Sequence, residues 1–250
     1  MTDIKIEFYG NSLNKENMNK FIEQNKNKAL EMDAFQLFSN LPNESVDATF
    51  FDPQYRPNLD KLKYGNEGKS RMKGRSKLKQ MSFGTICAFI LEIERVLKPS
   101  SYMYLWVDKF VVAEGVHSQW LNSTFEKEKL ILVDMIVWDK QSFGMGSRTR
   151  RTNEFLMVYQ KPPKIAKTWK RSPSIRDTWS EKIINPRSGH AHRKPPVLQS
   201  TLLKATLPVG SLVLDPCAGS FTTWLSAKMS EMDFIGCDLD TSNVLDILKG

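Results

Sequence analysis

Apolar residues along the chain occur in two patterns: short continuous runs, and stretches in which they recur every three or four positions. The short runs are rich in β-branched and aromatic residues and predict buried strands at residues 45–51, 102–107, 131–140, 153–161, 211–216 and 233–238. The helical period predicts helices at residues 29–41, 81–97, 111–121, 197–205 and 222–229. Because the predicted strands and helices alternate, we expect an α/β fold with a doubly wound, mostly parallel sheet.

Three stretches lack this periodicity. Residues 11–28 are polar, rich in Asn and Lys, and predict a weak helix or a loop. Residues 61–79 are expected to form a mobile loop, and residues 162–190, rich in Pro, Lys and Trp, an irregular insertion. With 250 residues, 40% of them apolar, the chain is long enough for one large domain, residues 1–250, that carries such an insertion.

The cysteine, histidine and hydropathy patterns exclude several classes of protein. The three cysteines have no Cys-x-x-Cys spacing, which disfavours a disulfide scaffold or a zinc finger. His190 and His192 have one other histidine in the chain to join them and no cysteine nearby, so we expect no metal site. The chain begins without a secretory signal and has no run of about 18 apolar residues. We therefore expect a soluble, cytoplasmic protein with no membrane span.

Basic side chains are concentrated in two segments of a chain whose net charge is +8. Residues 61–79 carry eight basic side chains and one acidic one, and residues 140–194 carry 14 basic and three acidic ones. The rest of the chain therefore has a net charge of −10. An acidic body with two basic segments predicts a polyanionic partner, nucleic acid first, although either segment alone is equally compatible with a solvated surface.

The strand, turn and helix at residues 211–229 have the form of a nucleotide-binding unit. Gly219 allows close approach of the backbone to a ligand, and Asp238 ends the next strand, where a carboxylate suits both hydroxyls of a ribose. Gly-x-Gly-x-x-Gly is absent, so NAD and FAD are disfavoured and a cofactor without a pyrophosphate, such as S-adenosylmethionine, fits better. The alternative is that Asp215-Pro216 is only a turn and Asp238 a solvated strand end.

A second candidate site is Asp52-Pro53-Gln54-Tyr55, which follows the predicted strand 45–51. The exocyclic amine of a base is a poor nucleophile, and a carboxylate that accepts its hydrogen bond localises the nitrogen lone pair. An aromatic ring stacks on a flipped base and replaces the lost base stacking. The alternative is a plain Asp-Pro turn at a strand end.

Five short motifs, in one order along the chain, are similar to those of the bacterial DNA amino-methyltransferases of the β group, which modify adenine N6 or cytosine N4. The resemblance runs over nearly the whole chain from about residue 30. Asp52-Pro53-Gln54-Tyr55 resembles the Asp-Pro-Pro-Tyr catalytic motif, and the other four matches are Asp33-Ala34, His190-Ala191-His192-Arg193-Lys194-Pro195, the cofactor motif Asp215 to Thr223, and Phe234-Ile235-Gly236-Cys237-Asp238.

The resemblance implies a Rossmann-like methyltransferase of the restriction–modification type that uses S-adenosylmethionine, no metal, and a base flipped out of duplex DNA. Asp52 and the Pro53 carbonyl would accept the amine hydrogens, and Tyr55 would stack on the base. Asp at the head of the motif points to adenine N6, because cytosine-N4 enzymes usually carry Ser there. The cofactor site implied by the family comprises Asp33, Ala34, Asp52, Lys194, Asp215, Pro216, Cys217, Ala218, Gly219, Ser220, Thr222, Thr223 and Asp238, with Asp33 at the adenine, Asp238 at the ribose and Lys194 closing the pocket.

For DNA, the resemblance implies that residues 140–189 are the target-recognition region and that the basic loop 61–79 closes over the duplex. The candidate contacts are Lys69, Arg71, Lys73, Arg75, Lys77, Arg148, Arg150 and Arg151. A homodimer and a companion restriction endonuclease remain open from the sequence.

The sequence departs from the family pattern at three positions. Gln54 replaces a proline in the turn that aims Tyr55, Phe221 replaces a glycine of the cofactor loop, and Ala191 replaces a proline. Phe221 either narrows the cofactor pocket or points into the core. The alternatives that stay open are a cytosine-N4 enzyme, a DNA-binding relative that has lost catalysis, and an RNA or small-molecule methyltransferase.

Overall fold

The computed structural model describes residues 14–55, 80–127, 129–142, 148–164, 169, 175–182, 193–244 and 248. Its strands are β1 (Leu30–Glu31), β2 (Val46–Phe51), β3 (Leu97–Val107), β4 (Ile131–Asp139), β5 (Asn153–Gln160), β6 (Thr178–Ser180), β7 (Leu212–Asp215) and β8 (Asp233–Asp238). Its helices are α1 (Lys15–Asn25), α2 (Ala34–Ser39), α4 (Phe83–Val96), α5 (Lys109–Ala113), α6 (Val116–Thr124), α7 (Pro196–Thr206), α8 (Thr222–Lys228) and the short 3-10 helix η2 (Thr241–Asn243).

The described strands form one sheet in the order β1-β8-β7-β2-β3-β5-β4-β6. Strands β1, β8, β7, β2 and β3 are mutually parallel, and β5 runs antiparallel to both β3 and β4. Strand β2 lies between β3 and β7. The chain passes from β2 to its neighbour β3, and it forms the neighbour on the other side, β7, only later in the sequence. The carboxyl ends of β2 and β7 therefore lie side by side, which is where sheets of this class bind their ligands.

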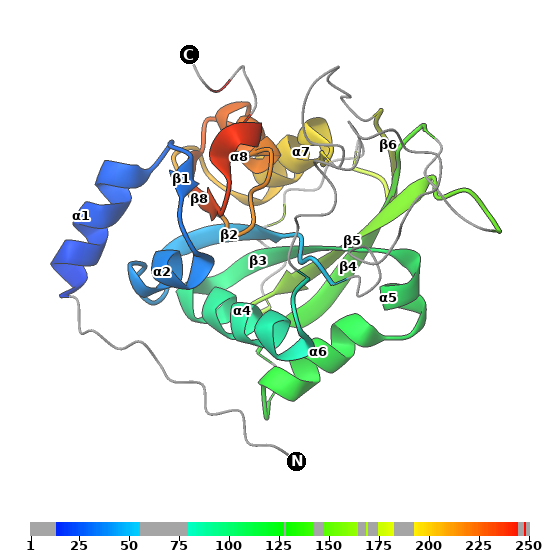
Figure 1. The fold of residues 1–250 in the computed structure, drawn as a ribbon, viewed down its shortest axis with the longest axis horizontal. Coiled ribbons are helices and arrows are strands. Elements are labelled where there is room, and N and C mark those ends of the chain that lie inside the picture. Colours follow the sequence, from blue (N-terminus) through cyan, green and yellow to red (C-terminus); the bar gives the residue numbers. More distant parts are fainter. Residues whose placement is uncertain are drawn as a thin grey trace.

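Helices cover both faces of the sheet, with α4 and α6 on one side and α7 and α8 on the other (Figure 1). The layering follows from the two-residue period of the strands, which sends successive side chains to opposite faces. The sheet therefore has an apolar core on each face. Phe51 stacks on Phe89 of α4 in one core, whereas Phe50 stacks on Tyr104 in the other core, which also contains residues of α7 and α8. Both faces are apolar, so the central strands read as continuous apolar runs.

The structure revises two predicted elements and decides between the alternatives for a third. Residues 29–41 do not form one helix, because Leu30 and Glu31 pair with β8 and the Asp33 side chain begins α2 by accepting a hydrogen bond from the Phe35 N–H. Residues 111–121 are divided between α5 and α6, with Gly115 in a left-handed conformation (φ 66°) at the start of α6. The polar stretch 11–28 contains the helix α1.

Several predictions fall outside the described residues. They are the loop 61–79 with Lys69, Arg71, Lys73, Arg75 and Lys77, the His190-Ala191-His192 part of the fourth motif, and most of the segment 162–190. Of the predicted target-recognition region, the described parts include strand β6, which pairs with β4, and Trp169, whose ring contacts Tyr102 edge-on at 5.6 Å.

Candidate active site

Four carboxylates from separate motifs meet at the carboxyl edge of the sheet. Asp52 directly follows β2, Asp215 ends β7, Asp238 ends β8, and Asp33 follows β1. The register places Asp215 opposite Gly236 and Asp238 opposite Glu31. Since these strands are parallel and adjacent, residues that end them must come close together, although they are far apart in the sequence.

The electrostatics of Asp215 show how near these carboxylates lie to one another. The pKa of Asp215 is raised to about 7, chiefly by burial; two hydrogen bonds oppose this rise, and the charges of Asp52 and Asp238 add to it. Those bonds come from the Thr223 hydroxyl, at 2.6 Å, and the Cys217 N–H, at 3.0 Å. The same neighbours act on the buried Cys217 thiol, whose pKa is raised by burial and then by Asp215, Asp238 and Asp52. Asp52 and Asp238 thus share one acidic region.

The loop between β7 and α8 wraps around Asp238. The Gly219 N–H donates to one carboxylate oxygen of Asp238 at 2.9 Å, and Gly219 itself has φ 52°, a conformation that glycine adopts without strain. Phe221 also has a positive φ, 59°, at the position where the family usually has glycine. Its side chain is fully buried and packs edge-on against both Trp224 and Phe234, so it points into the core and not into the loop's ligand-facing side.

The Asp52 motif forms a tight turn despite Gln54. The Pro53 carbonyl accepts from the Tyr55 N–H at 3.1 Å, and the Gln54 carbonyl accepts from the Met81 N–H at 2.7 Å. The Tyr55 hydroxyl accepts a hydrogen bond from the Asp108 N–H at the end of β3, and its ring lies 5.7 Å from Trp120. Tyr55 is therefore anchored at both its ring and its hydroxyl, which limits the loosening expected from the missing second proline.

Lys194 connects the Asp52 motif to strand β5. Its ammonium lies 3.0 Å from an Asp52 oxygen and 2.8 Å from an oxygen of Glu154, and 5.1 Å above the Trp106 ring. Glu154 is not among the site residues predicted from the sequence; it is a charged residue that directly precedes the apolar run Phe155–Tyr159. The sequence signal that could have identified Glu154 is an acidic residue at the start of a buried strand, because a buried charge needs a partner.

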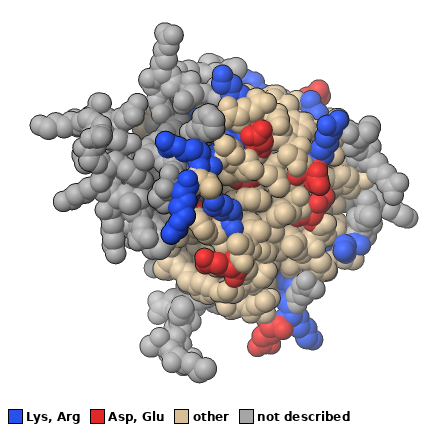
Figure 2. All heavy atoms as spheres, turned by 90° about the vertical axis from the view of Figure 1, so that its right-hand side faces the viewer, with Lys and Arg blue, Asp and Glu red and all other residues tan. Residues whose placement is uncertain are grey.

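The predicted DNA contacts that are described lie beside the same edge. Arg148 and Arg150 are exposed, and Arg151 is 3.7 Å from Asp108 and 5.5 Å from the Phe110 ring. Lys109 at the start of α5 donates to the Thr149 hydroxyl at 3.2 Å, which holds the segment 148–151 against α5. Figure 2 turns the side with α5, β4 and β5 toward the viewer and shows Lys and Arg side chains grouped on it.

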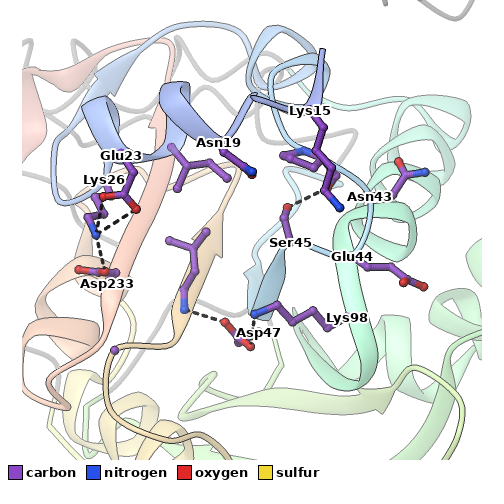
Figure 3. A pocket seen from close by; sticks show the side chains of 14 residues that line it. Lys15, Asn19, Glu23, Lys26, Asn43, Glu44, Ser45, Asp47, Lys98 and Asp233 are labelled. Atoms are coloured by element: carbon purple, nitrogen blue, oxygen red, sulfur yellow. Dashed lines mark hydrogen bonds and ion pairs between the residues drawn. The ribbon is translucent and has the colours of Figure 1, made fainter. Parts of the chain in front are cut away.

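A cavity of about 300 Å³ lies at the opposite edge of the sheet, where the strands begin. Its walls include Asp47 and Lys98, joined by an ion pair of 2.7 Å, and Lys26 and Asp233, joined at 3.1 Å (Figure 3). Its charged groups thus pair with one another, and it is remote from the strand ends that carry the motifs. We assign the candidate active site to the carboxyl edge.

Sequence comparison identifies the family of the chain. The model of the DNA methylase family, which comprises N6 and N4 methyltransferases, matches residues 46–249. The chain belongs to the DNA methylase family. This methyltransferase is 47% identical to the type II methyltransferase M.HhaII of Haemophilus parahaemolyticus, over 85% of this chain and 91% of the relative. It is 25% identical to the type II methyltransferase M2.DpnII of Streptococcus pneumoniae, over 86% and 87% of the two chains. It is a site-specific DNA methyltransferase of the restriction–modification type.

Solved structures confirm the fold of this methyltransferase. The cytosine-N4-specific PvuII DNA methyltransferase superposes with a TM-score of 0.63 at 14% identity, over 86% of this chain and 83% of that one. The M1.HpyAVI–SAM complex superposes with a TM-score of 0.59 at 20% identity, over 86% and 95%. The expected Rossmann-like, mostly parallel sheet is therefore confirmed, and the fold is shared with a cytosine-N4-specific enzyme.

The described residues contain neither a membrane-spanning helix nor a group of metal ligands. Within those ranges, no helix is both long enough and apolar enough to span a membrane. In the same part of the chain, no three His, Cys, Asp or Glu side chains gather as metal ligands.

Proposed function

We propose that this methyltransferase transfers the methyl group of S-adenosylmethionine to N6 of an adenine flipped out of duplex DNA in the cytoplasm. The observation that carries the proposal is the meeting of Asp52 with Asp215 and Asp238 at one sheet edge. Asp at the head of the motif supports adenine, because the cytosine-N4 enzymes that the motif resembles usually carry Ser there.

The acidic region fits the proposed cofactor. When bound, S-adenosylmethionine supplies an electrophilic methyl group on a positively charged sulfur. A buried carboxylate with its pKa raised to about 7, beside two further carboxylates, favours the binding of a cation, because a positive charge relieves their mutual repulsion. Asp238 is oriented by the Gly219 N–H at 2.9 Å and by the Asp240 N–H at 3.1 Å, which suits a carboxylate that holds a ribose.

Two observations support roles for Asp52 and Pro53 as acceptors of the target amine. The Asp52 side chain is 30% exposed, so a ligand can reach it, and one of its oxygens lies 3.0 Å from the Lys194 ammonium. The Pro53 carbonyl already accepts from Tyr55 and has a second lone pair for an amine hydrogen. Asp52 would accept a hydrogen bond from the amine, localise its lone pair, and take up the proton that the nitrogen releases after methylation.

The direct test is replacement of the carboxylate by its isosteric amide. Asp52→Asn should lower the turnover number by about 100-fold or more, because general acid–base groups contribute factors of that size. Cofactor affinity, measured by calorimetry, should change little. The exposed Asp134→Asn on β4 is the matched control and should keep full turnover. Unchanged turnover in Asp52→Asn would contradict the assigned role.

Mass analysis of nucleosides from methylated DNA separates the two target bases. The proposal expects N6-methyladenine, whereas N4-methylcytosine would identify the cytosine-specific alternative. A catalytically inactive DNA-binding protein is the remaining alternative, and calorimetry that detects no S-adenosylmethionine binding by the protein or its DNA complex would favour it. The burial of Phe221 in the core removes one reason for that alternative.

We further propose that Arg148, Arg150 and Arg151, with the basic segments 61–79 and 140–189, contact the DNA. Exposure of Arg148 and Arg150 next to α5 supports this proposal. Arginine recognises phosphate or guanine through paired hydrogen bonds.

A further inference from the structure

Four charged side chains of alternating sign run inward from the catalytic motif. Lys194 lies between Asp52, at 3.0 Å, and Glu154, at 2.8 Å, and the other oxygen of Glu154 lies 3.2 Å from Lys140. Glu154, Lys194 and Lys140 are only 16%, 14% and 11% exposed. The row joins the residue after β2, the segment before α7, strand β5 and the residue after β4.

Folding stability alone does not account for such a row. Removing charged groups from water costs free energy that their mutual attraction often fails to offset, so a buried network is weak evidence of a stabilising role. The two central groups, Glu154 and Lys194, are nevertheless held in their charged forms. Burial would raise the pKa of Glu154, but the Lys194 and Lys140 ammoniums outweigh burial and hold it at about 2. Burial would lower the pKa of Lys194, but Asp52 and Glu154 outweigh it and raise that pKa.

The position of Lys194 creates an electrostatic problem for the reaction. An ammonium at 3.0 Å orients the Asp52 carboxylate, but its charge weakens Asp52 as a hydrogen-bond acceptor. It also opposes the positive charge that develops on an amine during methylation. Glu154, at 2.8 Å on the inner side of Lys194, offsets that charge, while Lys140 fixes the second oxygen of Glu154.

We propose that Glu154 is a positioning residue for methyl transfer, which holds Lys194 against Asp52 and neutralises its charge so that Asp52 stays oriented and strongly accepting. This inference rests on the proposed role of Asp52. Asp215 of β7 also faces Asp52, and its negative charge acts on the carboxylate in the same sense as that of Glu154.

The test is a double-mutant cycle on Glu154 and Lys194. Glu154→Gln leaves the charge of Lys194 uncompensated, so the turnover number should fall by about tenfold or more, and the acidic limb of the pH–rate profile should move to lower pH. Lys194→Met should move that limb to higher pH. The combined variant lacks both charges, and we expect it to recover part of the turnover lost in Glu154→Gln.

A merely structural role for Glu154 gives a different pattern. In that case the combined variant would turn over no faster than Glu154→Gln, and the acidic limb would not move; either result with a folded protein overturns the inference. Glu94→Gln is the matched control, because Glu94 is 13% exposed and forms a 3.2 Å ion pair with the buried Lys161, remote from Asp52. It should lower the melting temperature without changing turnover or the pH profile.

A measurement that needs no turnover separates this inference from the proposed function. Carbon-13 NMR titration of labelled aspartate, with the Asp52 signal assigned through Asp52→Asn, reports the pKa of Asp52 directly. That pKa should fall in Glu154→Gln and rise in Lys194→Met. If the two variants showed these shifts but the wild-type protein did not methylate DNA, the result would count against the proposed function and not against the role of Glu154. Absence of both shifts would count against the role of Glu154, whether or not the enzyme methylates DNA.

Discussion

At the scale of single residues, two departures from the family pattern are absorbed by their surroundings. Phe221 adopts the left-handed conformation that glycine would provide, and the strain is offset by the complete burial of its ring. Gln54 replaces the second proline of the turn, and the Tyr55 hydroxyl contact with Asp108 anchors the ring instead. Phe221 therefore places no bulky group among the four carboxylates.

The pKa of Asp215 predicts how stability depends on pH in the absence of cofactor. The folded value of about 7 exceeds the ordinary 3.8, so between these values the folded protein holds a proton that the unfolded chain releases. Stability from Asp215 is therefore complete below pH 3.8 and is lost as pH rises through 7, a difference on the order of 4 kcal/mol.

Thermal melting of the wild type and Asp215→Asn at pH 5.5 and pH 8 checks this prediction. From pH 5.5 to pH 8, the melting temperature of the wild type should fall more than that of the variant. Burial lowers the pKa of His117, an effect of opposite sign that is common to both proteins and so cancels in the comparison. Equal losses would show that Asp215 is ionised throughout this range.

At the scale of elements, the pair β7–β8 places the acidic residues and tolerates little change. A Cβ at Gly236 would lie 2.5 Å from the Asp215 carbonyl and also overlap the Phe234 ring. The carbonyl belongs to the backbone of the neighbouring strand, so a side chain here must push β7 and β8 apart.

We therefore predict that Gly236→Ala lowers both the melting temperature and the affinity for S-adenosylmethionine, measured by differential scanning and titration calorimetry. Overpacking of this kind typically costs about 1–3 kcal/mol of stability. Gly210→Ala is a useful comparison, because its Cβ meets no atom within 4 Å and only the positive φ of 79° opposes it. Gly210→Ala should destabilise the protein without weakening cofactor binding. A cofactor affinity in Gly236→Ala equal to that of the wild type would contradict the proposed placement of Asp215 and Asp238.

At the scale of the whole molecule, charge is distributed unevenly along the chain. The chain has an excess of +18 in residues 61–79 and 140–194 and −10 elsewhere. The acidic region at the strand ends suits a cationic cofactor, whereas the exposed Arg148 and Arg150 beside α5 suit a phosphate backbone.

Replacing Arg148 and Arg150 together by alanine should weaken DNA binding and make it less dependent on salt. If each arginine neutralises one phosphate, the slope of log K against log salt concentration should decrease in magnitude by about 2. Lys204→Ala with Lys228→Ala removes the same charge from exposed positions on α7 and α8 and should leave the slope nearer the wild-type value. Equal slopes for both double variants would show that Arg148 and Arg150 do not contact phosphates.

The sequence by itself determined the fold class and the positions of the motifs. Buried strands such as Val46–Phe51 and Asp233–Asp238 are apolar on both faces, and this local property predicts a parallel sheet with helices on either side. The sequence pattern did not predict the strand Leu30–Glu31. A strand of two residues is too short to show the alternation of apolar and polar positions, and it forms because it pairs with β8.

Only the tertiary structure decided which charges meet. Strand order brings Asp52 beside Asp215, and the return of the chain before α7 brings Lys194 between Asp52 and Glu154, residues separated by 40 or more positions from it. No periodicity in a sequence encodes such contacts, because they depend on the order in which distant strands pair. The direction of the Phe221 side chain was likewise decided by packing. A residue in a glycine position faces the pocket or the core according to which side has room, and here the ring packs edge-on against Trp224 and Phe234.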